Sequence, residues 1–210
     1  MLIIFGGLPA TGKTIIAREL ARQLGAVHVR IDSIEQAIWD SGVLSSRIND
    51  VGYRVGYAVA ADNLQFGRTV IADSVNPIQL SRDAWVEVAN RAQVPAVEIE
   101  VTCSDTNEHR RRVETRISDI AGSRSLTWQE VVSRDYHLWN REHIVIDTAV
   151  RFPRKPWIPG ATRSATARQR IRVGDRTPAP LRLVRRAADA VCRHDQQIRQ
   201  LGGDQARRPG

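Results

Sequence analysis

Short apolar runs alternate with longer amphipathic segments over the first 150 residues of the chain. The apolar runs are rich in β-branched residues, as buried strands are, and lie at 2–5, 26–31, 69–72, 97–103 and 144–146. In the segments between them, apolar side chains recur at helical spacing, as Ile16, Leu20 and Leu24 do. This alternation predicts one α/β domain over residues 1–150, with a five-stranded parallel sheet covered by helices on both faces.

Capping signals predict where the helices begin. Ser33 and Gln36 form a predicted capping box for a helix over 34–40, and Thr127 and Glu130 form another for a helix to about residue 139. Pro77 is expected at the start of a helix that runs to about residue 91. The other predicted helices span 13–24, 50–66 and 105–120.

The pattern ends at residue 151. Residues 151–210 are interrupted by prolines and dominated by arginine, alanine and threonine, which predicts a mostly disordered tail with one candidate helix at 181–201. Residues 1–150 hold 16 Lys and Arg against 19 Asp and Glu, whereas the tail holds 15 against 4. The net charge of +8 therefore belongs to the tail, and a nucleic-acid partner is expected for the tail alone, if for any segment.

Cysteine content and hydropathy favour a cytoplasmic protein. Cys103 and Cys192 lack metal-ligand spacing, and the five histidines show none either. The N-terminal apolar run lacks the features of a secretion signal, and no apolar stretch approaches the roughly 18–20 residues of a membrane span. We expect no membrane contact, and the sequence leaves the oligomeric state open.

A glycine-rich motif, GLPATGKT, follows the first predicted strand. It fits the phosphate-loop pattern of glycine, four residues, glycine, lysine and then serine or threonine. Its glycines allow successive N–H groups to converge on phosphate oxygens, the lysine reaches the outer phosphates, and the threonine hydroxyl suits a nucleotide-bound Mg²⁺. A purely structural glycine-rich turn is the alternative. The predicted ATP-binding residues are Gly7, Leu8, Pro9, Ala10, Thr11, Gly12, Lys13 and Thr14.

Two aspartates end the neighbouring strands. Asp73 follows the third strand and is a candidate Mg²⁺ ligand, or else a turn residue. The next residue is Ser74 rather than a water-activating glutamate, which favours transfer to an acceptor over hydrolysis. Asp32 follows the second strand and is a candidate base for an acceptor hydroxyl, or else a helix cap that Ser33 could replace.

Arginines and tyrosines supply further candidates. Arg112 and Arg116 share one face of the helix predicted over 105–120 and could close over ATP, or else form a solvated basic face with Glu108. Arg124 and Arg134 are further candidates. Tyr53 and Tyr57, one helical turn apart, could line an acceptor pocket with Asn76, although core packing is the more common role of such a pair.

These motifs together resemble the P-loop kinases of small molecules. GLPATGKT, the aspartate after strand two, IADSVNP at 71–77 and the Arg-x₃-Arg pair are similar to those of short AAA-type ATP-binding proteins, a group related to chloramphenicol phosphotransferase, gluconate kinase and zeta toxin. The resemblance covers residues 1–150. It implies a P-loop NTPase fold with strand order 2-3-1-4-5, ATP and Mg²⁺ as cofactors, metal ligands at Thr14 and Asp73, a base at Asp32, and lid arginines at Arg112 and Arg116.

The sequence therefore predicts an ATP-dependent phosphotransferase that moves the γ-phosphate to a hydroxyl of a small molecule. Two alternatives stay open. One is a zeta-toxin-like UDP-sugar kinase, which usually has a larger substrate-binding module than residues 33–68 provide. The other is a nucleotide-binding regulatory module whose basic tail contacts nucleic acid.

Overall fold

The computed structural model describes residues 1–43 and 49–149. The predicted tail at 151–210 and its candidate helix at 181–201 lie outside the described residues. The division of the chain at about residue 150 therefore stays a prediction.

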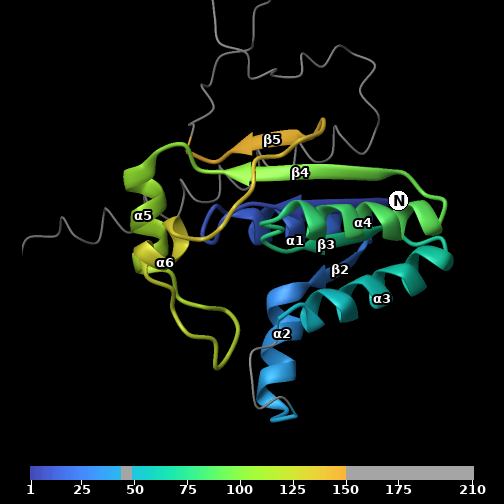
Figure 1. Ribbon diagram of the computed structural model, residues 1–210, viewed down its shortest axis with the longest axis horizontal. Helices are drawn as coiled ribbons and strands as arrows, with labels where there is room; N and C mark the ends of the chain where they lie inside the picture. Colours follow the sequence, from blue (N-terminus) through green and yellow to red (C-terminus); the bar gives the residue numbers. More distant parts are fainter. Residues whose placement is uncertain (44–48, 150–210) are drawn as a thin grey trace, which may run out of the picture.

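A five-stranded parallel sheet forms the centre of the molecule (Figure 1). Its strands, in the spatial order β2-β3-β1-β4-β5, are β1 (Leu2–Gly6), β2 (Val27–Arg30), β3 (Val70–Asp73), β4 (Ala96–Thr102) and β5 (Ile144–Asp147). All pairs are parallel, and Phe5 in the central strand lies opposite Asp73 on one side and Ile99 on the other. The predicted P-loop NTPase fold and its strand order are confirmed.

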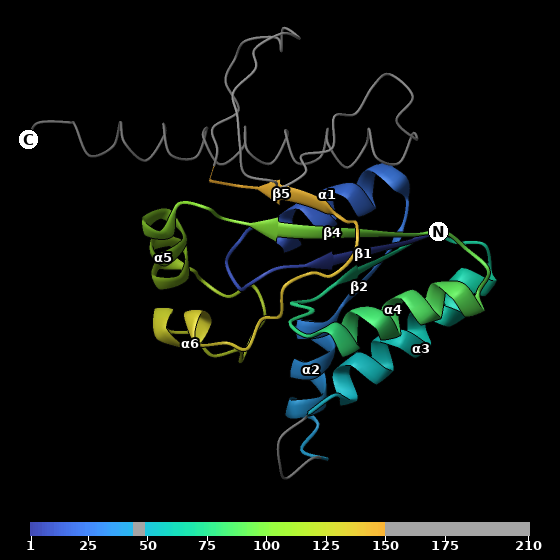
Figure 2. The same ribbon diagram turned by 45° about the horizontal axis from the view of Figure 1, so that its top comes forward.

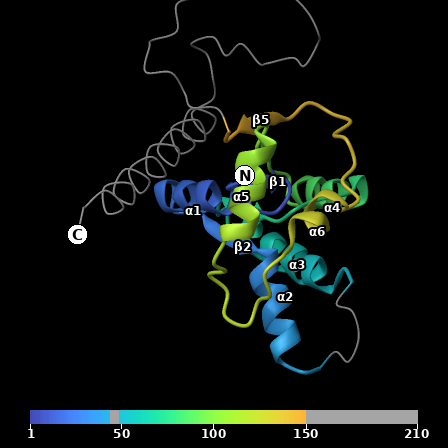
Figure 3. The same ribbon diagram turned by 90° about the vertical axis from the view of Figure 1, so that its left-hand side faces the viewer.

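Helices cover both faces of this sheet. They are α1 (Lys13–Leu24), α2 (Ile31–Asp40), α3 (Val51–Gln65), α4 (Gln79–Arg91), α5 (Thr106–Thr115) and α6 (Trp128–Val132). Figure 3 shows α1 on one side of the sheet and α3 and α4 on the other. The shorter helices α5 and α6 lie beyond the carboxyl ends of the strands, toward which the arrows in Figure 2 point.

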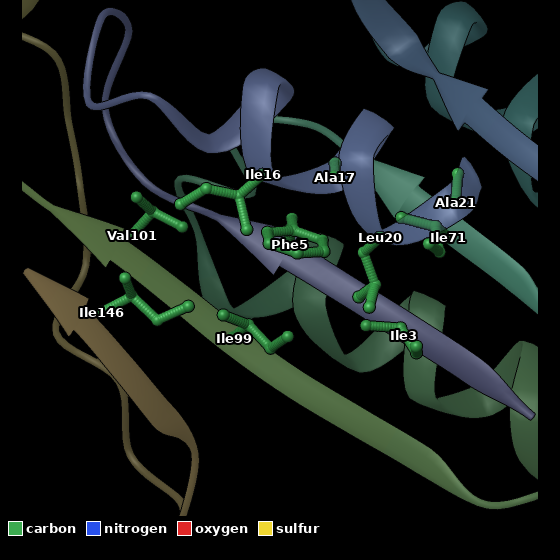
Figure 4. Close-up of a cluster of buried hydrophobic side chains, with 10 residues drawn as sticks. All are labelled: Ile3, Phe5, Ile16, Ala17, Leu20, Ala21, Ile71, Ile99, Val101 and Ile146. Carbon is green, nitrogen blue, oxygen red and sulfur yellow. The ribbon is translucent and has the colours of Figure 1, made fainter. Parts of the chain in front are cut away.

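The central strand explains why the sheet needs helices on both faces. All five residues of β1 are buried, and because side chains alternate along a strand they enter two separate cores. Ile3 and Phe5 pack against α1, as Figure 4 shows, whereas Leu2 and Ile4 pack in the cluster on the α3 and α4 side. The apolar run at 2–5 thus fixes the middle of the fold.

Two predicted helix starts are wrong. The capping box of Ser33 and Gln36 does not form, because β2 runs directly into α2, whose N-cap is Arg30, and Ser33 already lies within the helix. The helix predicted from Pro77 begins instead at Gln79. The Pro77 carbonyl oxygen accepts hydrogen bonds from the Arg82 guanidinium and the His137 N–H, so it is committed to contacts other than a helical turn.

The capping box of Thr127 and Glu130 is confirmed, but α6 ends at Val132 rather than near residue 139. The following segment packs on the fully buried side chain of Arg82, which donates to the carbonyl oxygens of His137 and Leu138. The rings of Tyr136 and Trp139 lie 5.2 and 4.3 Å from its guanidinium carbon. These long-range contacts to α4 outweigh the local preference for helix.

Candidate active site

The loop between β1 and α1 is a compact turn with unused N–H groups. Gly7 donates its N–H to the Val75 carbonyl oxygen at 3.0 Å, and the Thr11 hydroxyl donates to the Leu8 carbonyl oxygen at 2.9 Å. Within the described residues, the backbone N–H groups of Gly12, Lys13 and Thr14 have no acceptor. Free N–H groups at the start of a helix form a nest for an anion, so the loop is built to bind phosphate.

Gly7→Ala is expected to destabilise the protein by about 3–5 kcal/mol, because it combines backbone strain with a collision. Gly7 has φ +136°, and a Cβ atom there would come within 2.2 Å of the Val101 carbonyl oxygen, which belongs to the sheet. The matched control is Gly25→Ala, at φ +59° with no atom within 4 Å of the new Cβ, and we expect it to cost only about 1–2 kcal/mol. Urea unfolding measures both, and equal losses would contradict this account.

Lys13 is a buried cation without a partner among the described residues. Its side chain faces the cleft described below and is only 5% exposed, and among the described residues its ammonium makes no hydrogen bond or ion pair. Burial lowers the pKa of Lys13, although the nearby charges of Asp73 and Asp32 oppose this shift. Because an unpaired buried charge is costly, the arrangement fits an anionic ligand that supplies the missing partner.

Asp73, Thr14 and His28 form a hydrogen-bonded group next to Lys13. The Thr14 hydroxyl lies 3.3 Å from Asp73 Oδ1, and His28 Nε2 on β2 lies 3.2 Å from Asp73 Oδ2. Burial alone would raise the pKa of Asp73, but the His28 contact, the charge of Lys13 and the Thr14 hydrogen bond hold it below its usual range. The carboxylate is therefore ionised.

An ionised carboxylate beside a hydroxyl oxygen fits Mg²⁺, which prefers oxygen ligands and usually shares them with substrate phosphates. Thr14 and Asp73 therefore suit the predicted metal position. Within residues 1–43 and 49–149, no group of three or more His, Cys, Asp or Glu side chains is arranged to hold a metal ion.

A cleft of about 470 Å³ opens beside the phosphate loop, between α2 and the segment that follows α5. Lys13, Asp32 and Arg116, which come from three separate segments, all line it. Arg124 and Arg134 line it as well. The charges of Arg116 and Arg134 lower the pKa of Lys13, so both arginines are close enough to act on the same ligand.

Asp32 lies in the first turn of α2 rather than at the end of β2. Its carboxylate does not cap the helix and makes no hydrogen bond or ion pair within the described part of the chain. The alternative reading of Asp32 as a helix cap therefore fails. Its charge raises the pKa of Lys13, which shows that the two groups interact across the cleft.

The predicted end of the helix over 105–120 is wrong. It stops at Thr115, and Arg116 has the extended dihedrals φ −66° and ψ 125°. Arg116 therefore reaches the cleft from a turn, whereas Arg112 stays on α5, where its guanidinium donates to Glu108 and to the hydroxyl and carbonyl oxygens of Thr148. The two arginines do not share one helix face.

Arg112 contacts the phosphate loop indirectly, through Thr148. The Thr148 hydroxyl, which accepts from Arg112 at 2.8 Å, lies 2.8 Å from the Thr11 carbonyl oxygen. His109 contacts the loop directly, because its Nε2 lies 2.8 Å from the Pro9 carbonyl oxygen. A direct role for Arg112 at the transferred phosphate stays a prediction.

The segment after Arg116 is anchored by a cluster of charges. Arg30 at the end of β2 makes two hydrogen bonds to the Asp119 carboxylate, at 2.9 and 3.0 Å, and Arg18 on α1 reaches the same carboxylate at 2.5 Å. The hydrogen bond to Arg30 is the largest cause that holds the pKa of Asp119 below its usual range. This anchor holds Arg116 over the cleft.

Asp119→Ala is expected to destabilise the protein by about 1–3 kcal/mol, because Arg30 is buried and would lose its carboxylate partner, while Asp119 is itself partly exposed to solvent. It should also release the segment that carries Arg116 and weaken nucleotide binding. The matched control is Glu114→Ala, which removes an exposed ion pair to Arg110 on α5. Denaturation and nucleotide titration test this expectation, and wild-type behaviour in both would contradict it.

Tyr53, Tyr57 and Asn76 have packing contacts in this structure. Tyr57 packs edge-on against Trp85 with ring centroids 4.6 Å apart, and the Tyr53 hydroxyl accepts from the Asn76 N–H. The Asn76 side chain is fully buried and donates to the Phe5 carbonyl oxygen at 2.7 Å. None of the three lines the cleft, and their role in acceptor binding stays a prediction.

Two residues beside the candidate site were missed in the sequence. His28 is a polar residue within an apolar run, but only the pairing of β2 with β3 reveals that it contacts Asp73. Glu35 lines the cleft one helical turn after Asp32, and this i, i+3 spacing was the available signal.

Comparisons place this architecture among known proteins. A family model described as an AAA domain matches residues 2–134. Kti12 from Chaetomium thermophilum, solved with ADP-AlF3, is 24% identical with a TM-score of 0.53, over 70% of this chain and 89% of that chain. The APS kinase CysC from Mycobacterium tuberculosis, solved with AMPPNP and APS, is 17% identical with a TM-score of 0.52, over 70% and 87%. These structural likenesses show a shared fold.

No curated protein matches the chain significantly. None of the helices in the described ranges combines the length and apolar character needed to cross a membrane.

Proposed function

The chain belongs to the AAA-domain family, and on this basis we propose that it is an ATP-dependent phosphotransferase that moves the γ-phosphate of ATP to a hydroxyl of a small molecule. One observation carries the proposal. A buried ammonium, that of Lys13, and a carboxylate, that of Asp32, line the same cleft, and neither has a partner among the described residues. Phosphoryl transfer needs this combination, a cation for the phosphates and a carboxylate for the acceptor.

The phosphate end of the cleft is cationic. The free N–H groups of Gly12, Lys13 and Thr14 bind phosphate oxygens, and the Lys13 ammonium neutralises the outer phosphates. Arg116 and Arg134, which also line the cleft, add positive charge for the same phosphates. When bound through Thr14 and Asp73, Mg²⁺ supplies further neutralisation of the phosphate charge.

The acceptor end contains Asp32. Its carboxylate orients the acceptor hydroxyl and takes its proton as the acceptor oxygen bonds to the γ-phosphorus. The bond from that phosphorus to the bridging oxygen breaks, and ADP leaves. Because Asp32 has no other partner within the described residues, its oxygens are available for this contact.

A transfer assay with γ-labelled ATP tests the proposal. The full-length protein is incubated with Mg²⁺, labelled ATP and a panel of sugars, nucleosides and antibiotics that carry hydroxyl groups. We expect label on at least one organic acceptor, and none when Lys13 is replaced. Label released only as inorganic phosphate would identify a hydrolase instead and overturn the proposal.

A further inference from the structure

One face of α2 carries three unlike side chains toward the cleft. Asp32, Glu35 and Trp39 occupy helical positions i, i+3 and i+7, which lie on the same side of a helix, and all three line the cleft. Trp39 is 60% exposed, although large aromatic side chains usually seek burial. This acidic and aromatic face opposes the wall that carries Arg116 and Arg134.

Packing, rather than an ion pair within the described residues, holds Glu35 in place. Within the described residues its carboxylate makes no hydrogen bond or ion pair. A Cβ atom at Gly52 on α3 would lie 2.3 Å from Glu35 Cγ, so the missing side chain at Gly52 makes the room that Glu35 occupies. Burial and the charge of Asp32 raise the pKa of Glu35 to about 7, although the charge of Arg134 opposes this shift.

Four cations among the described residues line the cleft, and one of them, Arg124, is already paired with Glu130. Lys13 lies beside the phosphate loop, and Arg116 and Arg134 act on Lys13 through their charges. Once a nucleotide binds, its phosphates neutralise these groups. Arg134 acts on Glu35, and Arg30 acts on Asp32, through their charges, but neither carboxylate makes an ion pair within the described residues. A ligand ammonium would form one, and the exposed ring of Trp39 adds an aromatic face that attracts cations.

We propose that Asp32, Glu35 and Trp39 bind an ammonium group on the acceptor, so that the phosphorylated molecule is a hydroxylated amine such as an amino alcohol or an amino sugar. This inference rests on the proposed phosphotransferase function and names its substrate class. The hydroxyl meets Asp32, which takes its proton, and the ammonium meets Glu35 and Trp39. Acceptors that are anionic near the hydroxyl are repelled by the two carboxylates.

The test measures transfer from Mg·ATP to a panel that includes ethanolamine, serinol, glucosamine and kanamycin. Each amine is paired with its N-acetylated form, which keeps the hydroxyls and removes the charge, and glucose 6-phosphate serves as an anionic sugar. We expect the best acceptors among the amines. N-acetylation should raise KM by about 10- to 100-fold, as expected when one partner of a close charge pair is lost.

Two variants address Glu35 itself. Glu35→Gln should raise KM for the amine by about tenfold or more. The ratio of kcat/KM for the amine to kcat/KM for its N-acetylated form should then approach one. Gly52→Ala should lower the same ratio by displacing Glu35, while the added methyl group favours helix α3 and keeps the fold. The matched control is Glu87→Gln, which removes an exposed carboxylate of α4 outside the cleft and should leave the ratio as in the wild type.

The outcomes separate this inference from the proposed function. Transfer that depends on Lys13 but prefers neutral or anionic acceptors overturns the inference and leaves the phosphotransferase standing. No transfer to any amine also overturns the inference, and no Lys13-dependent use of ATP with any acceptor overturns both. An unchanged ratio in both Glu35→Gln and Gly52→Ala would remove Glu35 from the acceptor site.

Discussion

Lys13→Met is expected to lower phosphoryl transfer strongly while leaving the protein at least as stable as the wild type. The Lys13 ammonium is buried and has no partner within the described residues, so in the free protein its charge costs energy that folding must supply. Methionine keeps an unbranched side chain of similar length and removes the charge. With ATP bound, the same charge neutralises the outer phosphates, so its loss should lower transfer on the order of 10²–10³-fold.

The measurement pairs single-turnover transfer with urea unfolding. The matched control is Arg22→Met, which removes an exposed cation of the same helix that is paired with Glu19. We expect this control to transfer at the wild-type rate. Strong destabilisation of Lys13→Met would show that the ammonium has a structural partner, and wild-type transfer would remove the phosphate loop from the reaction.

Substitutions of the two aspartates of the site are expected to impair different steps of the reaction. Asp73→Asn should weaken the use of Mg·ATP with every acceptor, including water, because an amide replaces an ionised carboxylate that contacts Thr14 and His28. Asp32→Asn should leave ATP affinity nearly unchanged, yet lower transfer by about 10²–10⁴-fold, as is typical for a lost general base.

Calorimetric titration with ATP and single-turnover transfer to an identified acceptor distinguish the two variants. Asp83→Asn serves as a control, since Asp83 is largely exposed on α4 and outside the cleft. If Asp32→Asn transfers at the wild-type rate, the acceptor hydroxyl lies elsewhere. If both variants lose ATP affinity equally, the assignment of metal and base to separate carboxylates is wrong.

The sequence by itself determined the phosphate loop and the layers of the fold. The loop is readable because its chemistry depends on contiguous residues, Gly7 to Thr14, whose backbone geometry is set by two glycines with positive φ. The layers are readable because β1 and β3 bury apolar side chains on both faces of the sheet, whereas the other strands and the helices bury them on one face, which leaves a periodic pattern in the chain.

Tertiary structure decided where the polar side chains of the site meet. The Arg30–Asp119 ion pair joins residues 89 positions apart, and the His28–Asp73 contact joins residues 45 positions apart. Neither pair leaves a local pattern, because its energy depends on how distant segments approach each other after the sheet has formed. For the same reason the ends of α5 and α6 were predicted too late, since Asp119 and Arg82 hold the following residues through contacts that local helix preference does not include.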